Sequence, residues 1–182
     1  MLKANLEHII RAASAITNEY EIIVVGSQSI LASVDQPPLE CVISREADII
    51  VANNERLSDL IDGAIGEGSM FEEQFGYYAQ GVDFTTSVLP NGWRDRLVRL
   101  QSSNTDGKAG LCLDVYDLFV SKCVANREKD RVFNKALLRE RIINAETACE
   151  RADLLPLFPD VIARLKTHIQ RLHNEVFTAA DT

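Results

Sequence analysis

Apolar residues recur at helical spacing in the first segment of the chain and at strand spacing in several later segments. The segment Met1–Thr17 places its apolar residues on one face of a helix, which predicts an amphipathic helix packed on a sheet. Five short runs are rich in β-branched or alternating apolar residues and are bounded by turn-forming residues, as is typical of strands. The predicted strands are Glu21–Val25, Ala47–Ala52, Val82–Phe84, Arg96–Leu100 and Leu111–Val115.

Helical patterns separate the first strands and dominate the second half of the chain. We expect a short helix over Ser27–Val34 and a longer one that is capped by Asn53 or Asn54 and stopped by Gly66 and Gly68. From Asp117 onward the pattern is helical, with breaks near Asn144, Pro156 and Pro159. This order predicts an α/β (α+β) fold, with a mixed sheet flanked by helices over residues 1–115 and a helical C-terminal region over 116–182 that closes a cleft.

The composition limits the classes of protein that this chain can belong to. Its 182 residues suffice for one domain, or for a small catalytic domain with a helical appendage. Hydrophobic residues at 46% and charged residues at 25% match a globular protein. The net charge of -8 argues against a protein that coats nucleic acid, because neutralising phosphates requires clustered Lys and Arg. A net charge of this sign does not exclude a local basic patch.

The cysteines and the apolar runs indicate where the protein resides. Cys41, Cys112, Cys123 and Cys149 are widely spaced and contain no C-x-x-C pair, so we interpret them as reduced core residues. The first residues lack the pattern of a secretory leader, and no apolar run reaches the length of about 18 residues that a membrane span needs. We therefore expect a cytoplasmic protein that does not enter membranes.

Two acidic side chains and a glycine-serine pair are the first candidates for chemistry. Glu46 and Asp48 lie on one face of their predicted strand, because strand side chains alternate. Paired carboxylates favour a hard divalent cation such as Mg²⁺ or Mn²⁺. Gly26 and Ser27 fall where a strand gives way to a helix, and backbone amides there can bind a phosphate. The alternatives are a solvated strand edge for the acids and a plain helix cap for Ser27.

These residues and two later segments resemble a known family. Gly26-Ser27 followed by Glu46-Ala47-Asp48-Ile49 resembles the signature of the nucleotidyltransferase superfamily with the DNA polymerase beta-like fold. The segments F-G-Y-Y-A-Q-G-V-D, ending at Asp83, and D-L-F-V-S-K-C-V-A-N-R-E-K-D, ending at Asp130, resemble small bacterial members related to abortive-infection and toxin-antitoxin toxins. The resemblance covers the chain to about Leu138 and implies transfer of a nucleoside monophosphate from a triphosphate, with release of pyrophosphate.

The resemblance also assigns roles to residues. It implies that Asp83 is the third metal-binding carboxylate and a candidate base for the acceptor. It implies that Lys122, Arg127 and Lys129 contact the triphosphate, with Asp130 orienting them. Lys122, Asn126 and Lys129 have the spacing of one helix face, and a lysine among apolar neighbours is costly unless it meets an anion. The alternative is a solvated charged helix with local pairs such as Arg127 with Asp130.

Several functional alternatives stay open. The resemblance implies an RNA end, such as a tRNA 3′ terminus, or a protein side chain as acceptor, and a cognate antitoxin as partner. A catalytically idle nucleotide-binding or interaction module and a three-acid metal nuclease are the competing hypotheses. The long spacer before Glu46, and Glu where Asp is commoner, leave the number of metal ions open. Tyr77 and Tyr78 either stack a base or fill the core.

Overall fold

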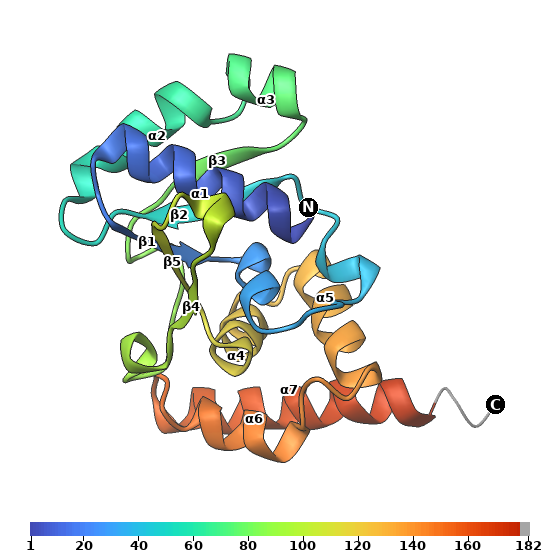
Figure 1. Ribbon diagram of the computed structural model, residues 1–182. Coiled ribbons are helices and arrows are strands. Elements are labelled where there is room, and N and C mark those ends of the chain that lie inside the picture. Colours follow the sequence, from blue (N-terminus) through green and yellow to red (C-terminus); the bar gives the residue numbers. More distant parts are fainter. Residues whose placement is uncertain (179–182) are drawn as a thin grey trace. The chain divides into compact units, whose positions relative to one another are not determined.

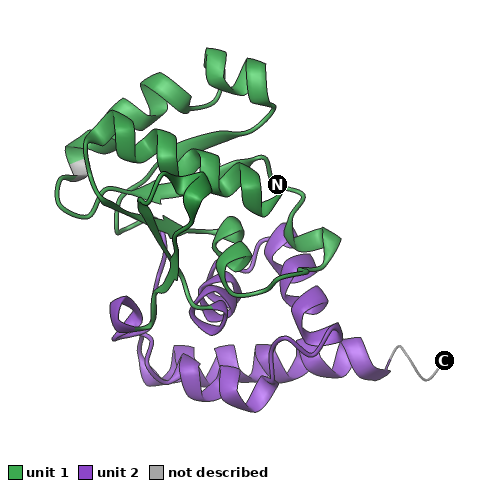
Figure 2. Cartoon of the chain, in the orientation of Figure 1, with its two compact units in different colours: residues 1–86, 96–114 green, residues 87–95, 115–182 purple. Residues whose placement is uncertain are grey.

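The computed structural model describes residues 1–178, except for the side chain of Glu55. The chain divides into two compact units, shown in different colours in Figure 2. The first unit comprises residues 1–86 and 96–114, and the second comprises residues 87–95 and 115–182. The hydrophobic pattern did not separate the segment 87–95 from the sheet around it.

The first unit is built on a five-stranded mixed sheet with the order β3-β2-β1-β5-β4 (Figure 1). The central strand β1 pairs antiparallel with β2 and parallel with β5, β3 is parallel to β2, and β4 is antiparallel to β5. This mixed sheet with helices confirms the predicted fold class. The strands are β1 (Glu21–Val25), β2 (Glu46–Ile50), β3 (Tyr78–Gly81), β4 (Val98–Leu100) and β5 (Ala109–Cys112).

Helices pack on one face of this sheet. A Cβ added to Gly110 of β5 would collide with Ile10 of α1, and one added to Gly81 of β3 would collide with Ser58 of α2. The first helix buries its apolar face, as its pattern predicts. The α-helices of this unit are α1 (Lys3–Thr17), α2 (Ser58–Ile65) and α3 (Met70–Phe75), and the 3-10 helices that lie wholly within it are η1 (Ser27–Ala32), η2 (Leu39–Cys41), η3 (Glu55–Leu57) and η5 (Ser103–Thr105).

The third strand lies earlier in the chain than the sequence predicts. The prediction of a strand at Val82–Phe84 is wrong, because β3 ends at Gly81. The Val82 amide still donates to the Ile49 carbonyl at 2.8 Å, and the chain then turns, with the Thr86 amide bonded to the Asp83 carbonyl at 3.2 Å. Pairing with β2 therefore selects a segment without β-branched residues over the neighbouring alternating one.

The second unit is helical, and its breaks follow recognisable capping chemistry. Asn144 accepts hydrogen bonds from the amides of Glu146 and Thr147, which confirms the break predicted near Asn144. A further break, which was not predicted, lies at Asn126, whose φ of 49° ends a helix. Within residues 1–178, no helix has the length and apolarity to cross a membrane. The α-helices of this unit are α4 (Val115–Ala125), α5 (Glu128–Arg139), α6 (Ala145–Ala152) and α7 (Pro159–Thr178).

Candidate functional site

The chain bends sharply where β1 ends. Gly26 adopts φ 67° and ψ -166°, a backbone conformation that is essentially restricted to glycine. The amide and the hydroxyl of Ser29 both donate to the Gly26 carbonyl oxygen, at 3.3 and 2.8 Å. The helix expected over Ser27–Val34 is consequently shorter and tighter, a 3-10 helix over Ser27–Ala32.

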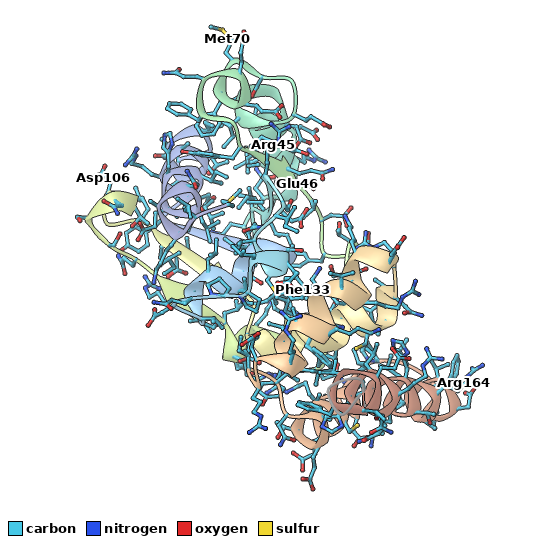
Figure 3. All side chains as sticks on the ribbon, turned by 90° about the vertical axis from the view of Figure 1, so that its right-hand side faces the viewer. Arg45, Glu46, Met70, Asp106, Phe133 and Arg164 are labelled. Carbon is cyan, nitrogen blue, oxygen red and sulfur yellow. The ribbon has the colours of Figure 1, made fainter. Side chains whose placement is uncertain are left out.

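Two carboxylates lie next to this bend. Glu46 and Asp48 are half-buried on one face of β2, whereas the residue between them is buried on the other face. The sheet register pairs Asp48 with Val25, the residue before Gly26. A Cβ at Gly26 would overlap Oδ2 of Asp48 and lie 2.9 Å from its Cγ. The structure therefore brings Gly26 and Asp48 into direct proximity, and Glu46 projects from the same strand (Figure 3).

A buried amide links the bend to the beginning of β2. The side chain of Gln28 is fully buried, and its Nε2 donates to the Ser44 carbonyl at 3.3 Å. The Ser44 hydroxyl in turn accepts a hydrogen bond from the Glu46 amide at 3.1 Å. Oε1 of Gln28 is buried without a hydrogen-bond partner among the described residues. Gln28 thus fixes the bend relative to the strand that carries the acids.

The neighbouring strand β3 contributes neutral side chains to the same face. The register pairs Glu46 with Tyr78 and Asp48 with Gln80, and paired residues of parallel strands point to the same side of a sheet. The Tyr78 hydroxyl donates to Oε2 of Glu46 at 3.4 Å. Burial raises the pKa of Tyr78, and the negative charge of Glu46 raises it further, so the phenol stays a proton donor at neutral pH.

The two adjacent tyrosines have different environments. Tyr77 bonds through its hydroxyl to Nδ1 of His8, at 2.8 Å, and packs with Phe71 and Phe75. It therefore belongs to an aromatic cluster around His8, whereas Tyr78 lies on the face of the acids. Burial, and to a lesser extent the charge of Arg11, lower the pKa of His8, so its ring is neutral at physiological pH.

Asp83 lies apart from the acidic pair. It is exposed and lies two residues beyond the end of β3 at Gly81, where the chain turns. Its carboxylate accepts hydrogen bonds from the hydroxyl and the amide of Thr85, and these lower its pKa. Among the described residues, no group of three His, Cys, Asp or Glu side chains could hold a metal ion. The structure thus brings Glu46 and Asp48 together without Asp83.

Within the second unit, Lys122 meets an internal anion. Lys122 is buried, and its Nζ lies 3.0 Å from Oδ1 of Asp130 and 4.5 Å from the ring centre of Phe133. Arg127 binds the other oxygen of Asp130 at 2.7 Å. Burial lowers the pKa of Lys122 despite this partner. Burial alone would raise the pKa of Asp130, but the hydrogen bonds from Arg127 and Lys122 outweigh it and lower the pKa.

The single cationic helix face expected for this region is not formed. The spacing of Lys122, Asn126 and Lys129 predicts one helix face, but the chain leaves the helical conformation at Asn126 and a new helix begins at Glu128. Lys122 consequently belongs to α4 and Lys129 to α5, where Lys129 is exposed. Arg127 precedes α5 and its side chain is 61% exposed, so its charge is accessible although it is paired with Asp130.

Sequence reasoning missed three residues of the candidate site, namely Gln28, Tyr78 as a neighbour of Glu46, and Gln80. A signal for Tyr78 and Gln80 was present, because they alternate with the small residues Ala79 and Gly81 in the segment Tyr78–Gly81. No such pattern marks Gln28.

A comparison with protein families assigns the chain to a family. A model of the family described as "Nucleotidyltransferase of unknown function (DUF6036)" matches residues 4–147, which include both candidate acids, the glycine-serine bend and the Lys122–Asp130 pair. No match was found among curated proteins or among solved structures. The match spans well over half of the chain and agrees with the resemblance seen in the sequence. The chain therefore belongs to this family of nucleotidyltransferases.

Proposed function

We propose that this protein is a metal-dependent nucleotidyltransferase that moves a nucleoside monophosphate from a nucleoside triphosphate to an acceptor hydroxyl and releases pyrophosphate. The observation that carries the proposal is the placement of the Asp48 carboxylate against the bare α-carbon of Gly26, with Glu46 on the same face of β2. The missing side chain of Gly26 lets the Asp48 carboxylate lie against the bend. Backbone amides at such a bend can bind a phosphate, and an acid beside them suits a cation that accompanies the phosphate.

The donor set fits Mg²⁺ or Mn²⁺. Glu46 and Asp48 offer carboxylate oxygens, which hard divalent cations prefer, and both side chains are accessible. When bound, the ion would neutralise charge on the triphosphate. The chain itself positions the groups: Tyr78 holds Glu46 through its hydroxyl, and Gln28 holds the bend against the beginning of β2. In this proposal Ser27, the first residue of η1, contacts the phosphates as part of the bend that follows β1.

Residues of the second unit enter the proposal through the family resemblance. Arg127 and Lys129 carry accessible positive charge, which suits contact with a triphosphate. Lys122 is assigned the same role by the resemblance, and its link to Asp130 and Arg127 would fix the position of the cationic group. We propose that replacing Arg127 or Lys129 by Ala raises the KM for the triphosphate more than it lowers kcat, because these charges act mainly in binding.

The acceptor in this proposal is an RNA end, such as a tRNA 3′ terminus, or a protein side chain, and the protein acts as the toxin of a toxin-antitoxin pair in the cytoplasm. The test is to mix the protein with Mg²⁺, each of the four α-labelled triphosphates in turn, and total cellular RNA or protein. We expect transfer of label by the wild type and none by Asp48→Asn or Glu46→Gln. If the wild type binds nucleotide but labels no RNA or protein, the enzymatic proposal is rejected.

One observation favours a second function, a nucleotide-binding module that does not catalyse transfer. The residue in register with Asp48 on β3 is the amide Gln80, and among the described residues no third His, Cys, Asp or Glu side chain joins Glu46 and Asp48 in a group that could hold a metal ion. Such a module would bind triphosphate and Mg²⁺ without releasing pyrophosphate. The two functions separate in cells as well: toxicity on expression that disappears in Asp48→Asn supports catalysis, whereas toxicity that persists in this variant supports the idle module.

A further inference from the structure

The strand β3 places a neutral polar side chain beside each of the two carboxylates. Tyr78 pairs with Glu46 and Gln80 pairs with Asp48 in the register of the parallel strands. Adjacent strands lie about 4.8 Å apart, so the side chains at positions 48 and 80 leave the sheet side by side. Tyr78 donates its hydroxyl proton to Glu46, whereas the side chain of Gln80 is exposed.

The neutrality of Gln80 limits the number of carboxylates at these paired positions. Tyr78 is a protonated phenol and Gln80 is an amide, so Glu46 and Asp48 are the two carboxylates among the four residues. A second cation on the same face would meet the charge of the first without a further carboxylate to offset it, and close like charges repel. An amide oxygen is a weaker ligand than a carboxylate because it carries no net charge.

We propose that Gln80 limits this face to a single divalent cation. The inference rests on the proposed function, in that Glu46 and Asp48 hold the ion, and it adds a role for a third residue of the chain. Gln80 lies at the point where a carboxylate would complete a site for a second ion. The neutral amide keeps that site weak and also avoids a third negative charge next to Asp48 when no ion is bound.

The test counts bound Mn²⁺ by electron paramagnetic resonance, with Mn²⁺ alone as the probe and no nucleotide. The variants are wild type, Gln80→Glu, and Gln74→Glu as a matched control that adds the same charge on the exposed surface of α3. Asp48→Asn gives the background of weak binding to the acidic surface. Above this background we expect one ion for wild type and Gln74→Glu, and two for Gln80→Glu. We also expect the first ion to bind about tenfold more tightly in Gln80→Glu, because a carboxylate near a divalent cation adds direct attraction.

The number of bound Mn²⁺ ions tests the role of Gln80 independently of catalytic activity. Two ions on the wild type, one ion on Gln80→Glu, or no ion above background on either protein would overturn it. A circular dichroism spectrum and a thermal melt establish that each variant is folded, which we expect since Gln80 and Gln74 are exposed. Failure of the proposed function has a different signature: the wild type binds one Mn²⁺ but transfers no label from any triphosphate.

Discussion

The carboxylate of Asp48 occupies the space that a side chain at Gly26 would need. Gly26 is also held at a positive φ by the two hydrogen bonds from Ser29 to its carbonyl oxygen. The bend after β1 and the acid on β2 are therefore mutually dependent: glycine is required for the backbone conformation and for the position of Asp48.

Replacing Gly26 by Ala should abolish transfer activity. This backbone conformation is open almost only to glycine, so we expect alanine to lower the free energy of unfolding by about 1–3 kcal/mol. The new Cβ would also displace Asp48. Gly68→Ala is the matched control, because Gly68 has φ 76° but no heavy atom near its missing Cβ. Urea unfolding measures the strain in both variants and label transfer measures the activity. Equal activities in the two variants would contradict a role for the Gly26–Asp48 contact.

Replacing Gln28 by Met should affect activity more than stability. The change removes the hydrogen bond to the Ser44 carbonyl, worth about 1 kcal/mol, and also removes the buried acceptor Oε1, for which the described residues offer no partner. These two effects oppose each other, so we expect the free energy of unfolding to change by about 1 kcal/mol or less. Activity should fall because the bend loses its link to β2. A variant with full activity would show that Gln28 has no positioning role.

Replacing Asp130 by Asn should destabilise the protein strongly at neutral pH. The change removes the carboxylate that lies 3.0 Å from Nζ of the buried Lys122, and removing one partner of a buried ion pair costs about 3–5 kcal/mol in the free energy of unfolding. Asp160→Asn is the control, since it breaks an exposed pair with Arg164 and should change stability little. Urea unfolding of both variants gives the comparison. A loss no larger than that of the control would mean that Lys122 finds another partner or water.

The same pair predicts how stability depends on pH. The pKa of Asp130 is lowered in the folded protein from an ordinary value of 3.8, so its contribution is present above that value and is lost as the pH falls through the folded pKa. The wild type should therefore lose stability below about pH 4, and the difference between wild type and Asp130→Asn should shrink there. Urea unfolding between pH 7 and 3 measures this difference. A constant difference would indicate that Asp130 does not titrate in this range.

The cysteines should differ in their reactivity toward a thiol reagent. Burial raises the pKa of Cys112 and of Cys123 to about 12, and Cys41 is also buried, whereas Cys149 is half-buried. Because the thiolate is the reactive form, we expect one fast equivalent at pH 8 in the native protein, and none in Cys149→Ser. All four thiols should react in urea. A fast phase that persists in Cys149→Ser would show that a buried thiol becomes exposed in solution.

The parts of the fold that the sequence predicted are those in which the local pattern and the tertiary contacts agree. The strand Glu21–Val25 was predicted with its observed bounds, because it combines β-branched residues with burial of its last four residues. The alternation that placed Glu46 and Asp48 on one face is also observed, because Ala47 between them is buried on the opposite face. The third strand was misplaced because Tyr78–Gly81 has little intrinsic strand preference, and only pairing with β2 makes it a strand.

The parts of the candidate site that the sequence did not predict depend on long-range register and on a single residue. Gln80 becomes relevant only when it is known to pair with Asp48. The break at Asn126 depends on one positive φ, for which an asparagine is permissive but not diagnostic. Once that break is present, the anion that offsets the burial of Lys122 is Asp130, at the beginning of the next helix. The sequence predicted that Lys122 needs an anion and that Asp130 lies near it, but not that the two bind each other directly.

The segment 87–95 has a consequence for how such a protein can change in evolution. It lies between two parts of the sheet unit in sequence, yet it belongs to the helical unit, where the Asn91 amide donates to the Leu154 carbonyl at 2.8 Å. The chain passes between its units after residues 86, 95 and 114, so one crossover in the gene cannot exchange the helical unit intact. In a chimera that takes only the residues after 114 from another protein, the residue that pairs with position 154 would still come from the original chain. The two units are therefore expected to be inherited together.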